Sequence, residues 1–151
     1  MKLTSSAFKN NGKIPSKYTC DGKNINPNLE IAEVPEEAVS LVLIMDDPDV
    51  PNSIRPDGMW DHWIVFNIPP DTKEINEDSQ PQGINGKGTG GKLSYGGPCP
   101  PDKEHRYFFK LYALDIKLNT PEGSSKKEVE NAMKDHIIAE AVLVGKYKRI
   151  T

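Results

Sequence analysis

The chain has 151 residues, of which 36% are hydrophobic and 27% are charged, and its formal net charge is −3. This length suits one domain covering residues 1–151, and no apolar run approaches the roughly 20 residues that a membrane-spanning helix needs. The acidic balance also disfavours nucleic-acid binding, which depends on Lys and Arg side chains that neutralise phosphates.

Three strands are predicted in chain order from runs of apolar residues. The first is the run at residues 41–45, which stops at Asp46-Asp47-Pro48. The second covers residues 62–68 and ends at two prolines, which cannot donate hydrogen bonds to a sheet. The third covers residues 105–114, where alternation puts His105, Tyr107, Phe109 and Leu111 on one face. We expect these strands to form the centre of one sheet. Thirteen Pro and twelve Gly indicate many turns, which favours a β-sandwich over a helical bundle.

One helix is predicted near the end of the chain. Ser125 and Glu128 match a capping box, and apolar residues then recur at helical spacing. The helix should therefore run from about residue 126 to about residue 139. His136 falls on its apolar side and is interpreted as a structural histidine outside any site. A short strand at residues 142–144 should follow.

The segment from residue 72 to residue 97 is polar, rich in glycine and almost without periodicity. Loops of this length tend to be functional, so we expect a pocket beside it. Residues 86–91 match the spacing G-x-G-x-x-G, and Lys92 extends the match toward a phosphate-binding loop. Leu93 stands where such a loop needs Ser or Thr for magnesium, and Gly96-Gly97-Pro98 prevents a following helix. Nucleotide binding is therefore not expected.

Acidic and histidine side chains stand at the ends of the three predicted strands. Asp47 and Asp49 follow the first strand, whereas His62 and His105 begin the second and third. Such an Asp-rich turn by itself is usually a solvated turn whose carboxylates cap backbone amides. If the strands are neighbours, however, they deliver Asp, His and His to one concave patch. Protonated His, the Tyr107 hydroxyl and a buried Asp47 that orients an imidazole would together suit an anion.

Two cysteines, Cys20 and Cys99, match no metal-binding or redox spacing. They can pair only if the fold brings them together. The first residues lack the apolar stretch of a secretion signal, so a cytoplasmic location is expected. Free thiols are the default state of cysteines in that compartment.

Four blocks of the sequence together resemble the signature of the phosphatidylethanolamine-binding protein family, which includes Raf-kinase-inhibitor-like proteins. They are DDPDVP at residues 46–51, WDHW at 60–63, GPCPP at 97–101 and HRY at 105–107. The similarity extends to YTCDG at residues 18–22, to Asn26-Pro27 and to residues 136–145, so it covers nearly the whole chain. The compact length and the GPCPP block are most similar to the bacterial and archaeal branch.

The resemblance implies a mostly β fold, a Greek-key antiparallel β-sandwich with a small anion-accepting pocket at one end. It carries over a set of ligand-binding residues: Asp47, Asp49, His62, Gly97, Pro98, His105 and Tyr107. One departure stands out, because the family usually has a glycine shortly before its His-Arg-Tyr, where this chain has Asp102-Lys103-Glu104. Those residues add charge at the rim of the expected pocket.

Binding rather than catalysis is the expected function, because no Ser or Cys stands beside a base as an activated nucleophile. The expected ligand is a small anion such as phosphate or a phospholipid headgroup, without a cofactor or resident metal. The resemblance also implies a regulatory role through a kinase or protease partner, and a homodimer. The alternative is a metal-assisted hydrolase in which two His and Asp47 or Asp49 form a two-His-one-carboxylate site.

Overall fold

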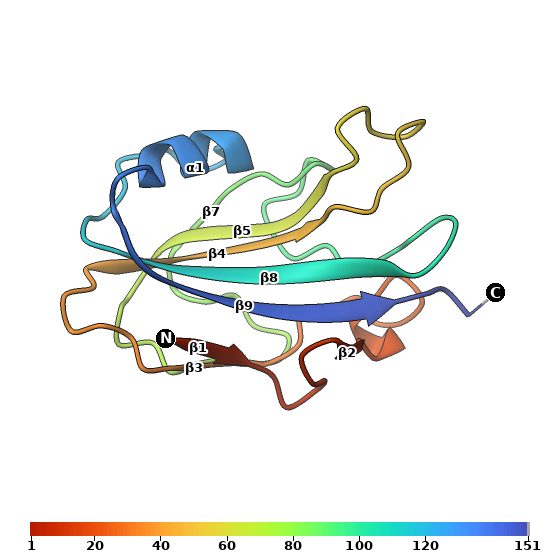
Figure 1. Ribbon diagram of the computed structural model, residues 1–151, viewed down its shortest axis with the longest axis horizontal. Coiled ribbons are helices and arrows are strands. Elements are labelled where there is room, and N and C mark those ends of the chain that lie inside the picture. The colour runs from red at the N-terminus through yellow and green to blue at the C-terminus, as the bar shows by residue number, and fades with distance from the viewer. Residues whose placement is uncertain (151) are drawn as a thin grey trace.

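Two packed β-sheets make up most of the regular structure in the computed structural model, which describes residues 1–150 (Figure 1). The larger sheet has the strand order β2-β9-β8-β4-β5-β7, and the smaller has the order β1-β3-β6. All neighbouring pairs are antiparallel except β2 and β9. The strands are β1 (Lys2–Thr4), β2 (Gly12–Lys13), β3 (Leu29–Ala32), β4 (Ser40–Asp47), β5 (Trp60–Ile68), β6 (Glu74–Ile75), β7 (Ile84–Asn85), β8 (His105–Leu114) and β9 (Ile137–Tyr147).

The centre of the larger sheet is β4, which pairs with β5 on one side and β8 on the other. All eight residues of β4 are buried, because the smaller sheet covers one face and α1 (Lys126–Met133) lies over the other. A strand buried on both faces reads as a continuous apolar run, and this is why it was visible in the sequence. The three predicted central strands and the mostly β fold class are confirmed.

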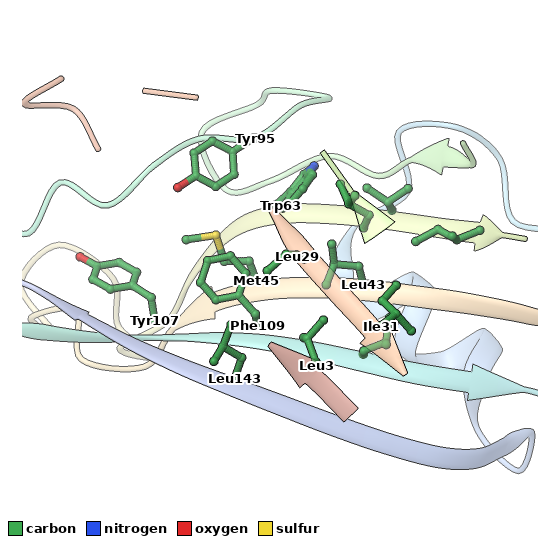
Figure 2. Close-up of a cluster of buried hydrophobic side chains, with 14 of the residues drawn as sticks. Leu3, Leu29, Ile31, Leu43, Met45, Trp63, Tyr95, Tyr107, Phe109 and Leu143 are labelled. Atoms are coloured by element: carbon green, nitrogen blue, oxygen red, sulfur yellow. The ribbon is translucent and has the colours of Figure 1, made fainter. Parts of the chain in front are cut away.

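Apolar side chains pack in two clusters, one on each side of the larger sheet. Figure 2 shows the cluster between the sheets, where Trp63 is buried and meets the Tyr95 ring edge-on, with ring centroids 5.3 Å apart. The second cluster packs Val129 and Met133 of α1 against the outer face of the larger sheet. The interpretation of Trp63 as a core residue is confirmed, since its exposed fraction is 1%.

The predicted helix begins at the expected residue but is shorter than the sequence indicated. Ser125 and Glu128 form the capping box, in which the Ser125 hydroxyl accepts a hydrogen bond from the Glu128 amide. The helix ends at Met133, because Asp135 adopts a left-handed backbone conformation with φ 69°. The chain then enters β9, which is much longer than the strand predicted at residues 142–144. The placement of His136 on the helix is therefore wrong: it follows the helix, and its Nδ1 lies 2.8 Å from Asp115 Oδ1.

Two short strands interrupt the segment that the sequence presented as one long loop. β6 joins the smaller sheet through β3, and β7 forms an edge of the larger sheet through β5. Each has two residues, which is too short for a periodic pattern to show. No helix among residues 1–150 is long and apolar enough to cross a membrane.

Cys20 and Cys99 form a disulfide that joins segments 79 residues apart in the sequence. The sequence left their pairing open, with free thiols as the default, and the fold decides for the disulfide. The fold brings the two segments together because the Cys20 amide donates to the Pro98 carbonyl oxygen, at 3.1 Å. The Tyr95 hydroxyl also donates to the Tyr18 carbonyl oxygen, at 2.7 Å.

Candidate functional site

A cavity of about 390 Å³ opens where the C-terminal end of β4 meets the starts of β5 and β8. Antiparallel pairing brings these three ends to the same edge of the sheet, as the sequence predicted (Figure 1). Asp47, His62, His105 and Tyr107 all line the cavity, and so does Gly97, so the fold gathers five of the seven predicted site residues. The other lining residues come from loops: Cys20, Asn24, Val50, Ile54, Gly88, Gly90, Lys92, Gly96, Cys99, Pro100 and Pro101, together with Trp60 and Asp61 of β5.

His105 lies between two carboxylates. Its Nδ1 is 2.7 Å from Asp47 Oδ2, and its Nε2 is 2.7 Å from Asp102 Oδ1. Carboxylates that are ionised only accept hydrogen bonds, so the ring donates from both nitrogens and is an imidazolium. Burial lowers the pKa of His105, but the hydrogen bonds to Asp47 and Asp102 outweigh this and hold it above the usual value. The expected role of a buried Asp47 in orienting and charging an imidazole fits this geometry.

His62, in contrast to His105, is held as a neutral ring. Its Nδ1 lies 2.7 Å from the carbonyl oxygen of Gly96, which can only accept, so Nδ1 carries the proton. Burial lowers the pKa of His62, and the ring is therefore neutral with Nε2 as an acceptor. The two predicted histidines thus contribute a charged ring and a neutral ring to one cavity.

Tyr107 lies at one end of the core, with its hydroxyl turned away from the labelled Phe109 and Leu143 side chains (Figure 2). Its ring meets that of His62 edge-on, with centroids 5.4 Å apart. The hydroxyl is buried and has no hydrogen-bond partner among residues 1–150. Burial raises the pKa of Tyr107, and the nearby Asp47 carboxylate adds to the effect, so the hydroxyl keeps its proton. A buried hydroxyl without a partner costs roughly 1–3 kcal/mol, which an incoming acceptor would recover.

The glycine-rich segment supplies another part of the wall. The Gly88 amide donates to the Lys92 carbonyl oxygen at 3.0 Å, and the Gly91 amide donates to that of Gly88 at 3.0 Å, so the segment is a tight turn. Gly88, Gly90 and Lys92 line the cavity, in agreement with the expected pocket beside this loop. Lys92 forms no ion pair within the described residues, so its ammonium group is available to an anionic ligand.

Gly97 and the disulfide close the opposite wall. The Gly97 amide donates to Asn24 Oδ1 at 2.8 Å, and any Cβ at this position would collide with that oxygen and with the Tyr18 carbonyl oxygen. Only glycine lets the two segments approach this closely. Both cysteines of the disulfide border the cavity, so the cross-link lies in the wall itself.

A Gly97→Ala substitution should therefore separate the two segments. We expect it to lower the free energy of unfolding by about 1–3 kcal/mol, since the added methyl group overpacks a site bounded by backbone. Urea denaturation monitored by tryptophan fluorescence measures this change. The matched control is Gly90→Ala, where a Cβ would lie 3.6 Å from the Trp60 ring, an ordinary contact. Equal destabilisation by both substitutions would show that the close approach at Gly97 is not the cause.

Two predicted residues lie outside the cavity. Asp49 is held by Arg106, whose Nε and Nη2 lie 2.9 Å and 2.8 Å from its carboxylate oxygens, and the Arg106 amide donates to it as well. This hydrogen bonding by Arg106 holds the pKa of Asp49 below its usual range. Asp49 thus ties the end of β4 to β8. Pro98 is buried beside the wall, where its carbonyl oxygen accepts from Cys20.

Asp61 borders the cavity, and its negative charge is balanced by a lysine of α1. Lys126 Nζ lies 2.9 Å from Asp61 Oδ1 and 3.1 Å from Asp46 Oδ2, and Lys110 Nζ is 2.9 Å from the same Asp46 oxygen. Burial lowers the pKa of Lys126, but the two carboxylates outweigh it and raise the pKa above its usual value. Asp46 and Asp61 are thereby neutralised from the side away from the cavity.

The residues that sequence reasoning missed belong mostly to loops, and Asp61 and Asp102 are the important ones for charge. Asp61 lies in the WDHW block, of which only the histidine was predicted to belong to the site. Asp102 was noted as a departure from the family pattern, but its contact with His105 was not foreseen. Its position three residues before His105 was the available signal, since a turn of that length can return a carboxylate to the ring.

The two-His-one-carboxylate alternative is not supported by this geometry. Both nitrogens of His105 are engaged by carboxylates, and Nδ1 of His62 is engaged by a carbonyl oxygen. Among residues 1–150, no group of three or more His, Cys, Asp or Glu side chains is arranged to hold a metal ion.

The architecture is thus a two-sheet β-sandwich with a cavity at the strand ends, walled by a histidine pair and a glycine-proline loop. Residues 4–148 match the sequence model of phosphatidylethanolamine-binding proteins. A UPF0098 protein of Methanothermobacter thermautotrophicus is 49% identical, with 99% of each chain covered. The chain therefore belongs to the phosphatidylethanolamine-binding protein family.

Solved structures agree with this assignment. The crystal structure of the phosphatidylethanolamine-binding protein homologue CT736 of Chlamydia trachomatis is similar with a TM-score of 0.96 and 49% identity, covering 98% of this chain and 97% of that one. Escherichia coli YbcL, described as a new member of the mammalian PEBP family, has a TM-score of 0.88 and 30% identity, with 98% of each chain covered. The predicted similarity to bacterial and archaeal members is confirmed.

Proposed function

We propose that the protein binds a phosphate group in the cavity at the ends of β4, β5 and β8. The observation that carries the proposal is the buried Tyr107 hydroxyl, which borders the cavity and has no partner among the described residues. A protonated phenol donates one hydrogen bond, and a phosphate oxygen is a strong acceptor. The ligand would thus satisfy a buried polar group of the wall that has no partner within the described part of the chain.

The charges around the cavity support an anion. The unpaired ammonium group of Lys92 and the His105 imidazolium both border it. Asp61 is balanced by Lys126, and Asp47 is held by His105. The neutral His62 offers an acceptor at Nε2, which suits a protonated phosphate oxygen or the ammonium group of a zwitterionic headgroup.

A phosphate group can reach this cavity as free phosphate, in a phosphorylated metabolite, or in the headgroup of a phospholipid. The family name points to phosphatidylethanolamine, and phosphoethanolamine carries both a phosphate and an ammonium group. We further propose that occupancy of the cavity serves regulation of a protein partner such as a kinase or protease. The cytoplasmic location and the homodimer stay predictions of the sequence.

Removing the Tyr107 hydroxyl tests the proposal. We expect Tyr107→Phe to bind phosphate or phosphoethanolamine roughly tenfold more weakly, because a hydrogen bond to a charged group is worth about 1.5–3 kcal/mol. Isothermal titration calorimetry measures the change. Co-sedimentation with phosphatidylethanolamine and phosphatidylcholine vesicles then distinguishes a lipid headgroup from a free anion.

The control is Tyr112→Phe, which also removes a tyrosine hydroxyl from β8. Tyr112 packs with the cluster under α1 and does not border the cavity. Its replacement should leave phosphate affinity unchanged. If Tyr107→Phe binds phosphate as tightly as the wild type, the cavity is not the anion site that we propose.

A further inference from the structure

Asp102 contacts the ring nitrogen of His105 that Asp47 leaves free. The imidazolium has two N–H groups, and Asp47 takes the one at Nδ1 from inside the fold. Asp102 takes the other at Nε2, with its side chain 42% exposed, whereas the His105 side chain is 0% exposed. The Asp102 carboxylate therefore covers the only N–H of His105 that does not face the interior.

The segment that carries Asp102 is held at its ends rather than along its length. Residues 100–104 make no backbone–backbone hydrogen bond to a neighbouring segment. The disulfide fixes Cys99 at one end, and His105 begins β8 at the other. Pro100 and Pro101, which precede Asp102, line the cavity. Asp102 can thus leave His105 without breaking any element of the fold.

A carboxylate oxygen and a phosphate oxygen make the same contact with an imidazolium N–H. Both are anionic acceptors that form short charge-assisted hydrogen bonds. A side chain tethered three residues away acts at an effective concentration in the millimolar range or above, which a free ligand must exceed. A singly charged free carboxylate gains nothing by replacing Asp102, whereas a phosphate dianion gains charge and further acceptor oxygens for Lys92 and Tyr107.

We infer that Asp102 is a built-in competitor that occupies the anion position on His105 Nε2 and must be displaced by the ligand. This inference rests on the proposed phosphate-binding function. It makes Asp102 a specificity-determining residue: the site rejects simple carboxylates and admits phosphate monoesters. It also gives the Asp102-Lys103-Glu104 sequence a role, because Asp102, although it does not itself line the cavity, contacts a histidine that does.

Asp102→Ala tests the inference by gain of binding, which a merely structural role would not produce. We expect the variant to bind inorganic phosphate roughly tenfold more tightly than the wild type. We also expect acetate to bind to the variant in the vacated position and not to bind to the wild type. Calorimetry measures both affinities, and the imidazole ¹⁵N resonances of His105 report whether the added anion reaches that ring.

Glu104→Gln is the matched control, because it removes a negative charge from the same segment and the Glu104 carboxylate forms no hydrogen bond or ion pair with the His105 ring. It should leave both affinities unchanged, and an effect equal to that of Asp102→Ala would attribute the gain to general charge. If the wild type binds phosphate and Asp102→Ala binds it no more tightly, Asp102 is not a competitor, and the proposed function stands. If Asp102→Ala takes up acetate at His105 but neither protein binds phosphate, the competitor is supported and the phosphate-binding function is wrong. If neither anion binds to either protein, both proposals are wrong.

Discussion

Removing the Cys20–Cys99 disulfide is expected to lower the free energy of unfolding by about 4 kcal/mol. The cross-link joins residues separated by 79 positions, so it strongly restricts the unfolded chain. A loop of this size corresponds to roughly 4–5 kcal/mol in the chain-entropy account, and measured losses in small domains are about 2–5 kcal/mol. Urea denaturation of a Cys20→Ala/Cys99→Ala double variant, compared with the wild type, measures the loss.

The same variant should bind phosphate within about threefold of the wild type, because that part of the wall is held by other contacts. The Tyr95 hydroxyl bonds to Tyr18, and the Gly97 amide bonds to Asn24, both between the segments that the disulfide joins. Loss of stability with retained affinity would place the effect of the cross-link in the unfolded chain. Wild type treated with a reducing agent is the control and should match the variant. An unfolding free energy within about 1 kcal/mol of the wild type would contradict the expectation.

The centre of the fold could be predicted from the sequence because its strands are buried. β4, β5 and β8 consist of apolar or alternating runs that are long enough to show a pattern. β2, β6 and β7 have two residues each and exist only because longer strands offer them partners. Such pairing is tertiary, so no local pattern announces it.

The helix shows how a periodic pattern can continue past the end of an element. His136 and Ile137 stand three and four residues after Met133, as in a helix. The left-handed conformation of Asp135 nevertheless turns the chain, and β-branched residues then enter β9. Aspartate tolerates that conformation better than most residues, but its presence alone does not require it.

In the site, too, the residues on strands could be predicted, whereas the contacts made by loops could not. Asp47, His62, His105 and Tyr107 could be placed together because antiparallel neighbours bring their ends to one edge. The loop partners of the two histidines could not be predicted, since Gly96 and Asp102 belong to loops whose paths depend on the whole fold. Those partners decide that His62 is neutral and His105 is charged, and therefore what the cavity can bind.

The charge of His105 should make stability depend on pH in a defined window. Its pKa is raised in the fold, so its stabilisation is complete below the unfolded value of about 6.5 and is lost as pH rises through the folded pKa. The hydrogen bond from His105 lowers the pKa of Asp102, so that contribution is present above the unfolded carboxyl value of about 3.9 and is lost as pH falls. Stability from this cluster should therefore be greatest between about pH 4.5 and pH 6.5.

Asp47→Ala should remove most of the stability loss that the wild type shows as pH rises through the folded pKa of His105. At pH 6 we expect it to lower the unfolding free energy by about 3 kcal/mol, because it strips one partner from a buried ion pair. At pH 9, where the wild-type ring has lost more of its charge, the difference between the two proteins should be smaller. The control is Asp115→Ala, which removes the carboxylate from the exposed pair with His136 and should cost less than about 1 kcal/mol at either pH. Denaturant titrations from pH 5 to pH 9 measure both variants. A loss in Asp47→Ala that is equally large at pH 6 and pH 9 would mean that Asp47 stabilises the fold independently of the His105 charge.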